Sequence, residues 1–169
     1  ILLILDEVQV GMGRTGKLFA YEHEDMKPDL LTVAKSLAGG VPIGALLIRD
    51  EIAKSFEPGD HASTFGGNPL ATAAGVAALS AILEEGMLDH CRRVGEYFLS
   101  RLEEIKKKFP FVKDVRGRGL ILGMELKIEG AEIVKKMMKK GFLINCTAGN
   151  VLRFLPPLIV TEEEVDRMI

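Results

Sequence analysis

The sequence predicts an α/β fold, with part of a mainly parallel sheet followed by a small α+β unit. The apolar runs at 1–5 and 30–34 are continuous rather than alternating, which is typical of strands buried on both faces of a parallel sheet. Two long helical patterns follow, and short strand and helix patterns then resume. We therefore expect three regions: the end of a large domain over 1–84, a connecting helix over 85–110 and a small domain over 111–169.

In the first region we expect strands at 1–5, 30–34 and 44–49. A helix should then begin after Asn68, whose side chain can cap free backbone amides, with Pro69 at the first helical position. Residues 70–83 are almost wholly apolar or alanine, so this helix should be buried on all sides. Gly86 follows two glutamates and should end it.

A second helix should run to Phe109, because apolar side chains recur at three- to four-residue spacing: Val94, Phe98, Leu102, Ile105 and Phe109. Beyond it we expect strands at 119–126, 142–146 and 151–154, and a helix at 131–140 closed by Gly141. Met137 and Met138 should pack from that last helix into the core. A capping box at 161–164 predicts a further helix.

Two charged side chains stand just past the ends of the first two apolar runs. Asp6 follows residues 1–5, and Lys35 follows residues 30–34. The carboxyl ends of neighbouring parallel strands form the edge where open α/β sheets bind ligands. A lysine amine can condense with a cofactor aldehyde as a Schiff base, and a carboxylate can keep a pyridine nitrogen protonated. Together with the Thr-Phe-Gly-Gly-Asn-Pro segment at 64–69, the pair suggests pyridoxal phosphate chemistry, although an ordinary ion pair or two solvated loop charges remain the alternative.

Seven segments resemble the class III aminotransferases in order and spacing, and together they run through the whole chain: 6–9 (Asp-Glu-Val-Gln), 13–16 (Gly-Arg-Thr-Gly), 28–29 (Pro-Asp), 34–35 (Ala-Lys), 39–45, 64–69 (Thr-Phe-Gly-Gly-Asn-Pro) and 153–157 (Arg-Phe-Leu-Pro-Pro). The resemblance implies the pyridoxal-phosphate-dependent transferase fold of type I. Within the family, residues 59–70 are most similar to the members that act on N-acetylornithine, and those that act on ornithine, succinylornithine or 4-aminobutyrate are close neighbours.

The resemblance also implies roles for single residues. Lys35 would bind the pyridoxal 5'-phosphate aldehyde and move the substrate proton, and Asp6 would contact the pyridine nitrogen. Val8 would pack on the cofactor ring, Gln9 would contact its phenolic oxygen, and Thr64 would reach the phosphate of a neighbouring subunit, so a homodimer with shared active sites is expected.

For the substrates, the resemblance implies that Ser63 touches an acetylornithine-type donor and that Arg153 binds the α-carboxylate of glutamate or 2-oxoglutarate. An interdomain salt bridge is the alternative role for Arg153. The implied reaction is ω-amino transfer from an N-acetylornithine-like donor to 2-oxoglutarate, a step of arginine biosynthesis.

A nucleotide-binding protein is the main competing interpretation. Residues 11–16 match the G-x-G-x-x-G fingerprint, and 11–17 nearly match a P-loop. However, no long amphipathic pattern follows, and Leu18 replaces the hydroxyl residue that would bind magnesium. A non-catalytic relative of the enzymes is the third possibility. We interpret Arg116 and Arg118 around Gly117 as a turn with solvated charges rather than an anion site.

Composition agrees with a cytoplasmic α/β enzyme. The net charge of −2 argues against a nucleic-acid surface, and no apolar run reaches the ~18 residues of a membrane span. Cys91 and Cys146 form no CxxC pair and should be neutral thiols, and the three histidines lack metal-ligand spacing. The chain begins inside an apolar strand and stops within a helix, so we expect an incomplete chain that is inactive alone.

Overall fold

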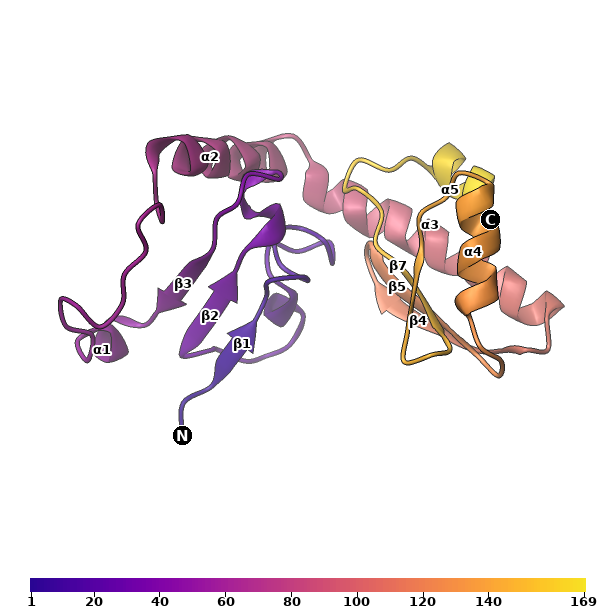
Figure 1. Ribbon diagram of the computed structural model, residues 1–169, viewed down its shortest axis with the longest axis horizontal. Helices are drawn as coiled ribbons and strands as arrows, with labels where there is room; N and C mark the ends of the chain where they lie inside the picture. The colour runs from indigo at the N-terminus through magenta and orange to yellow at the C-terminus, as the bar shows by residue number, and fades with distance from the viewer. The chain divides into compact units, whose positions relative to one another are not determined.

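The computed structural model describes residues 1–169 and divides the chain into two compact units (Figure 1). Unit 1 comprises Ile1–Gly13 and Lys17–Met87, and unit 2 comprises Arg14–Gly16 and Leu88–Ile169. No single helix is long and apolar enough to cross a membrane; only the pair formed by α2 (Pro69–Glu84) and α3 (Met87–Lys108), with a break between them, meets that length and composition.

Unit 1 is built on a three-stranded sheet with the order β1-β2-β3 (Figure 1). The strands are β1 (Ile4–Asp6), β2 (Leu30–Val33) and β3 (Ala45–Ile48), so all three predicted strands are present but shorter. β1 and β2 are parallel, whereas β3 is antiparallel to β2. The sheet is therefore mixed.

The prediction that the first strand is buried on both faces is wrong for these residues. Ile4 in β1 is 59% exposed, whereas Leu31 in the central strand β2 is only 4% exposed. β1 is an edge strand of this sheet, with a neighbour on one side only. Apolar composition alone does not reveal whether a strand is central or at the edge.

The helical elements of unit 1 are η1 (Ala20–His23), η2 (Lys35–Ala38), α1 (Asp50–Ala53) and α2 (Pro69–Glu84). The predicted cap is confirmed, because the Asn68 side chain accepts a hydrogen bond from Ala71 N at 3.0 Å. One face of α2 packs on η2, where Gly75 lies close to Leu37. Burial on all sides is wrong, since Leu70 and Val76 are 74% and 67% exposed.

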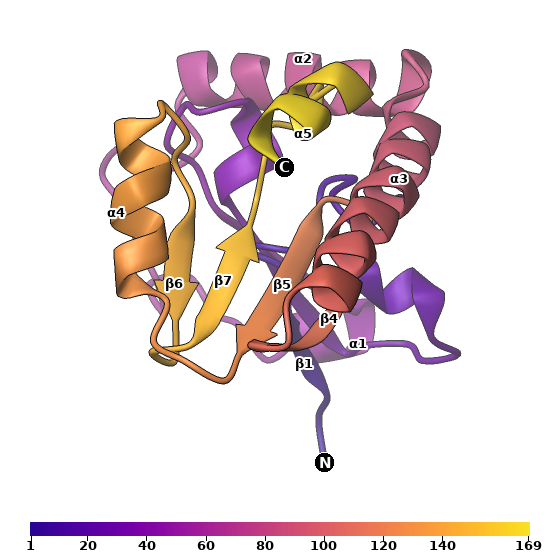
Figure 2. The ribbon, with the colours of Figure 1, turned by 90° about the vertical axis from the view of Figure 1, so that its right-hand side faces the viewer.

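Unit 2 contains a four-stranded antiparallel sheet with the order β4-β5-β7-β6 (Figure 2). The strands are β4 (Val112–Arg118), β5 (Ile121–Leu126), β6 (Asn145–Thr147) and β7 (Val151–Phe154). Its helices are α3 (Met87–Lys108), α4 (Ala131–Lys139) and α5 (Glu162–Met168). The predicted helices and the strand at 151–154 are confirmed to within about two residues.

The core of unit 2 lies between α3 and one face of the sheet. The predicted stripe is buried at Val94, Phe98 and Leu102, and the Phe98 ring meets that of Phe154 edge-on at 5.4 Å between centroids. Residues alternate along β5, with Leu122, Met124 and Leu126 buried. Phe109 lies beyond the end of α3 and is 45% exposed, so the stripe ends earlier than predicted.

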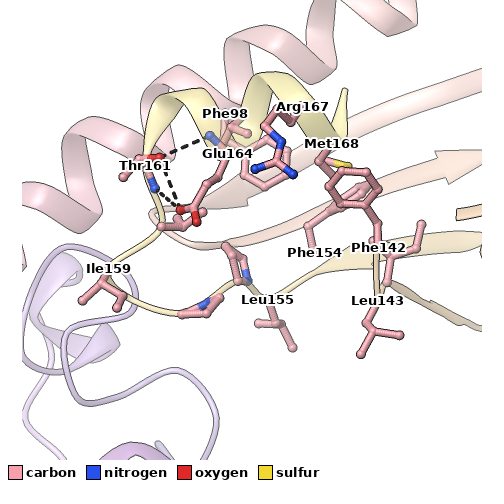
Figure 3. Close-up of a pocket in the computed structure, with 15 residues that line it drawn as sticks. Phe98, Phe142, Leu143, Phe154, Leu155, Ile159, Thr161, Glu164, Arg167 and Met168 are labelled. Carbon is pink, nitrogen blue, oxygen red and sulfur yellow. Dashed lines mark hydrogen bonds between the residues drawn. The ribbon is translucent and has the colours of Figure 1, made fainter. Parts of the chain in front are cut away.

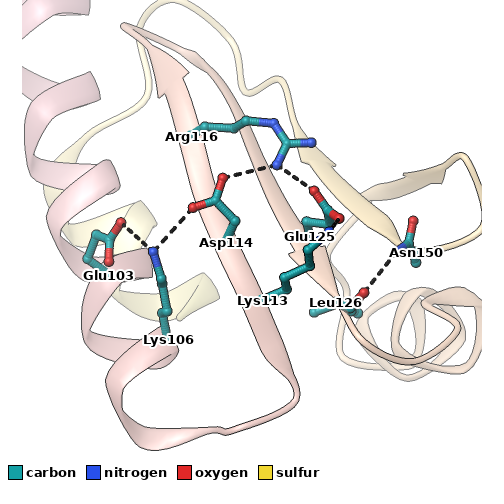
Figure 4. Close-up of polar contacts among 8 residues, drawn as sticks. All are labelled: Glu103, Lys106, Lys113, Asp114, Arg116, Glu125, Leu126 and Asn150. Atoms are coloured by element: carbon teal, nitrogen blue, oxygen red, sulfur yellow. Dashed lines mark hydrogen bonds and ion pairs between the residues drawn. The ribbon is translucent and has the colours of Figure 1, made fainter.

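Strand β4 was not predicted, and the expectation of a turn at 116–118 is wrong. Arg116 and Arg118 belong to β4 and pair with Gly123 and Ile121 of β5. A chain of ion pairs runs from α3 across β4 to β5 (Figure 4), formed by Glu103, Lys106, Asp114, Arg116, Glu125 and Lys113. The charged residues of β4 make it hard to recognise as a strand from sequence. Their ion-pair partners lie on neighbouring elements, and the local sequence does not reveal them.

The two methionines of α4 differ. Met137 lines a small apolar cavity of about 150 Å³ together with Ile133 and Leu152, as predicted for a packing residue. Met138 is 56% exposed, so the prediction that it packs is wrong. The short α4 presents only part of its circumference to β6, and the rest faces outward.

Candidate functional site

Asp6 and Lys35 lie at the carboxyl ends of adjacent parallel strands. Asp6 is the last residue of β1 and pairs in register with Thr32 of β2, and Lys35 follows three residues later as the first residue of η2. Both side chains are exposed. This is the edge at which open α/β sheets bind ligands, so the sheet brings the acid and the amine to one end.

The carboxylate of Asp6 is held through one oxygen. Its Oδ1 accepts hydrogen bonds from Val8 N at 2.9 Å and from Thr32 Oγ1 at 3.2 Å. Neither of these two hydrogen bonds involves the second carboxylate oxygen, Oδ2. The two hydrogen bonds fix the orientation of the carboxylate at the end of β1.

Lys35 has an unusual backbone conformation. Its φ is 50°, in the left-handed region that residues other than glycine rarely adopt. The structure shows neither a hydrogen bond nor an ion pair for its exposed amine. Strained backbone of this kind concentrates at functional positions, which makes Lys35 the strongest candidate for a reacting group.

Two residues that support this end of the sheet were missed from sequence. Thr32 contacts Asp6 from the neighbouring strand, and only the strand register reveals it. Glu7 is 3% exposed, and its carboxylate accepts backbone hydrogen bonds from Ala20 N and Tyr21 N, both at 2.9 Å. Glu7 therefore fixes the first residues of η1 to the end of β1. Its place directly after Asp6 was the available signal.

The other predicted cofactor residues fall in two places. Val8 and Gln9 lie in the turn that follows β1, directly beyond Asp6. Ser63 and Thr64 instead lie in an exposed loop before α2, where Ser63 Oγ accepts a hydrogen bond from Gly66 N at 3.0 Å. Ser63 lines an open hollow of about 860 Å³ formed by residues 41–44, 61–63, 65–68 and 70, whereas Thr64 does not line it. Neither Asp6 nor Lys35 lines that hollow.

Arg153 lies in unit 2, on β7. It pairs with Gly123 of β5 on one side and with Asn145 of β6 on the other. Its Nε donates a hydrogen bond to Asn145 Oδ1 at 3.2 Å. The neighbouring residues Leu152 and Phe154 are buried in the core, so Arg153 lies on the opposite face of the sheet.

The glycine-rich stretch 11–17 has a packing role within the two units rather than the geometry of a phosphate loop. In unit 2, a Cβ at Gly119 would come within 2.4 Å of Arg14 O, and Leu120 N donates to the same oxygen. The Arg14 guanidinium donates to Leu120 O and Pro156 O at 3.0 and 2.9 Å.

The element that follows the stretch is the four-residue η1, not the long helix whose amino terminus binds a nucleotide phosphate. In unit 1, the Lys17 amine donates to Glu22 O. The structure thus gives the nucleotide-binding interpretation no support.

An apolar hollow of about 550 Å³ lies in unit 2 between the segment after β7 and α5 (Figure 3). It is bordered by Phe142, Leu155 and Met168 among others, and none of the predicted site residues lines it. At its rim, Thr161 Oγ1 accepts from Glu164 N at 3.2 Å and Glu164 accepts from Thr161 N at 2.9 Å. The predicted capping box is therefore confirmed.

Neither cysteine forms a disulfide. Burial raises the pKa of the Cys91 thiol to about 11, although the nearby Arg14 acts in the opposite direction. The same burial lowers the pKa of Arg14. Cys91 is therefore a neutral thiol at pH 7, as predicted, and its Sγ points to Leu158 O at 3.7 Å.

The family described as Aminotransferase class-III matches residues 1–169. Among curated proteins, the acetylornithine aminotransferase of Methanocaldococcus jannaschii is 56% identical over 169 residues, which are 100% of this chain and 42% of that protein. The acetylornithine aminotransferase of Aquifex aeolicus is 55% identical over 169 residues and is covered to 43%. The chain thus spans about two fifths of the relatives it matches.

Solved structures give the same result for the fold. The ornithine aminotransferase from Toxoplasma gondii has a TM-score of 0.93 and 42% identity, over 99% of this chain and 41% of that one. The acetylornithine aminotransferase from Elizabethkingia anophelis has a TM-score of 0.92 and 38% identity, over 99% and 44%. The predicted fold class, the type I transferase fold, is confirmed.

Proposed function

Because the chain belongs to the class-III aminotransferases, we propose that it is part of an enzyme that transfers an ω-amino group from an N-acetylornithine-like donor to 2-oxoglutarate. The observation that carries this proposal is the placement of Asp6 and Lys35 at the ends of adjacent parallel strands. The names of the most similar curated relatives support the donor, and this reaction belongs to arginine biosynthesis. We place the enzyme in the cytoplasm.

The residues present fit pyridoxal 5'-phosphate. A carboxylate held by Val8 N and Thr32 Oγ1 and an amine without a protein partner are the two groups that this cofactor needs from the chain. One solved relative, the ornithine aminotransferase from Toxoplasma gondii, is described with pyridoxal phosphate at its active site. When bound, the cofactor supplies an aldehyde and an electron-withdrawing ring. Asp6, Val8, Gln9, Lys35 and Thr64 would hold it.

Each residue has a task that follows from its chemistry. Asp6, whose orientation is fixed by Val8 and Thr32, would pair with the protonated ring nitrogen of the cofactor. The Lys35 amine would hold the cofactor aldehyde and would carry a proton to and from the substrate carbon. This task needs an amine that is not engaged in an ion pair, as in unit 1.

Substrate recognition is assigned to Arg153 and Ser63. The planar guanidinium of Arg153 can bind the α-carboxylate of glutamate or 2-oxoglutarate with two parallel hydrogen bonds. Ser63 would contact the donor from the exposed loop before α2. We propose that Thr64 of this loop reaches the cofactor phosphate of a second subunit, so that the enzyme is a homodimer with shared active sites. Residues 1–169 alone should then be inactive.

The test uses the complete protein and two lysine variants. Borohydride reduction should leave pyridoxal phosphate covalently attached to Lys35, and Lys35→Ala should abolish the adduct because no other amine has this position. Lys17→Ala is the matched control, since the Lys17 amine donates to Glu22 O within unit 1. It should leave cofactor binding nearly unchanged. An adduct that persists in Lys35→Ala would refute the assignment, and a large loss in Lys17→Ala would favour the phosphate-loop interpretation.

Ornithine is the second candidate donor. The ornithine aminotransferase from Toxoplasma gondii has a TM-score of 0.93 and the acetylornithine aminotransferase from Elizabethkingia anophelis one of 0.92, so likeness of fold does not separate the two donors. Rates with N-acetylornithine and ornithine, measured side by side under single-turnover conditions, distinguish the two. A higher rate with ornithine would replace the proposed donor and leave the cofactor assignment intact.

A further inference from the structure

We propose that Asn145 is a positioning residue that orients Arg153 toward the substrate α-carboxylate. This inference rests on the proposed function, because it requires Arg153 to bind that carboxylate. Asn145 on β6 lies directly opposite Arg153 on β7, and its Oδ1 accepts the hydrogen bond from Arg153 Nε at 3.2 Å. Nothing in the amino-acid pattern links the two residues, which are eight positions apart across a turn.

The two neighbours of Arg153 in the sheet differ in a way that suits a binding role. On the β6 side stands the amide of Asn145, whereas on the β5 side stands Gly123, which has no side chain. A Cβ added to Gly123 would approach only Val151 Cγ1 at 3.4 Å and Arg116 O at 4.0 Å. The residue on the β5 side of Arg153 therefore carries no side chain, and the amide supports the guanidinium from the other side.

The chemistry of the partner matters as much as its place. A hydrogen bond to Nε fixes the guanidinium plane, which reduces the rotamer entropy lost when a carboxylate binds it bidentately. Because the Asn145 amide is neutral, it orients the arginine without offering a competing negative charge.

The experiment compares Asn145→Ala with Asn145→Asp in the complete, cofactor-loaded protein. The two half-reactions are followed separately by cofactor absorbance, one with glutamate and one with N-acetylornithine. Asn145→Ala should weaken apparent glutamate binding about two- to tenfold, the range that one hydrogen bond contributes, and change the acetylornithine half-reaction less than twofold. Asn145→Asp has nearly the same shape and should weaken glutamate binding more than alanine does, because its carboxylate competes for Arg153.

Asn150 supplies the matched control. It is an asparagine of the same unit, and its Nδ2 donates to Leu126 O at 2.8 Å, which ties the turn before β7 to the end of β5 (Figure 4). Asn150→Ala should lower the unfolding temperature and leave the ratio of the two half-reactions unchanged. A merely structural Asn145 would behave in the same way, and its aspartate variant would resemble the wild type.

Arg153→Ala separates failure of this inference from failure of the proposed function. If Arg153→Ala impairs the glutamate half-reaction selectively and Asn145→Ala does not, the positioning role is wrong and the proposed function stands. If Arg153→Ala affects both half-reactions equally, the carboxylate assignment is wrong and the role of Asn145 is refuted with it. In the Arg153→Ala background, Asn145→Ala should cause no additional loss, and an additive loss would overturn the inference.

Discussion

The largest fully buried side chains all belong to unit 2, whereas unit 1 leaves much of its apolar surface exposed. In unit 2 these are Leu102, Leu120, Leu122, Leu126, Val94, Val165 and Cys91. In unit 1, strands β1 and β3 and helix α2 expose Ile4, Leu46, Leu47, Leu70, Val76 and Leu83 by 44% or more. Unit 2 therefore completes a core from its own residues, and unit 1 does not.

The proposed chemistry is divided in the same way. Asp6 and Lys35, which would hold the cofactor, belong to the unit with the open core, while Arg153 belongs to the unit with the closed one. The left-handed backbone of Lys35 costs free energy, and the open core of unit 1 offsets little of that cost. A substrate-binding arginine on the outer face of a well-packed sheet has a rigid support.

The largest difference is expected when the two units are expressed as separate proteins. Residues 88–169 should give a monomer that unfolds cooperatively, because their core is nearly complete without other parts of the chain. Residues 17–87, and to a lesser degree the whole of 1–169, should associate through exposed apolar surface. Light scattering and thermal unfolding measure both properties. A monomeric, cooperative 17–87 would remove the distinction between the units.

The next largest effect concerns Arg153 and the two half-reactions of the complete enzyme. Removing one partner of a desolvated charge pair costs about 2–5 kcal/mol. Arg153→Ala should therefore slow the 2-oxoglutarate half-reaction by about 30-fold to a few thousand-fold, at 1.36 kcal/mol per factor of ten, with a much smaller effect on acetylornithine. Arg153→Lys should restore only part of the lost rate, because lysine cannot form the two parallel hydrogen bonds of a guanidinium. Single-turnover absorbance changes measure the rate of each half-reaction. A selective loss with acetylornithine would mean that Arg153 binds the α-carboxylate of the donor instead.

A pair of leucine substitutions compares the cores directly. Leu102 is fully buried in unit 2, so Leu102→Ala should lower the free energy of unfolding by about 2–5 kcal/mol. Leu70 is 74% exposed in unit 1, and Leu70→Ala should change it by less than about 0.5 kcal/mol in residues 1–169. Denaturant titration of both variants provides the values. A large cost at Leu70 would show that α2 is already covered, for example by a second copy of the chain.

The smallest effect is acid sensitivity of the ion pairs on unit 2. Hydrogen bonds from Lys113 and then Arg116 hold the pKa of Glu125 below its ordinary value of 4.5. A carboxylate with a lowered folded pKa stabilises the fold above its unfolded pKa and loses that contribution as the pH falls through the folded pKa. At pH values below 4.5, the unfolding temperature of residues 88–169 should thus decrease slightly. Glu125→Gln should reduce this pH dependence. An unchanged pH profile in Glu125→Gln would place the acid sensitivity elsewhere.

Local sequence was sufficient wherever a structure depends on near neighbours. The cap at Asn68, the capping box at Thr161, the stripe of α3 and the helix at 131–139 were all predicted, because helix signals repeat within a few residues. The placement of Asp6 and Lys35 after apolar runs was also readable. Their roles came from the resemblance to a family and remain predictions.

Tertiary structure decided what depends on partners distant in sequence. Strand β4 was hidden because its charges are paired with α3 and β5, and the exposure of β1 and α2 depends on what lies beside them rather than on their composition. The contacts of Asp6 with Thr32 and of Arg153 with Asn145 exist only through strand register. Strand register is set by the packing of a whole sheet. The neighbours of a residue in sequence therefore indicate its secondary structure, whereas only the fold determines which distant residue it contacts.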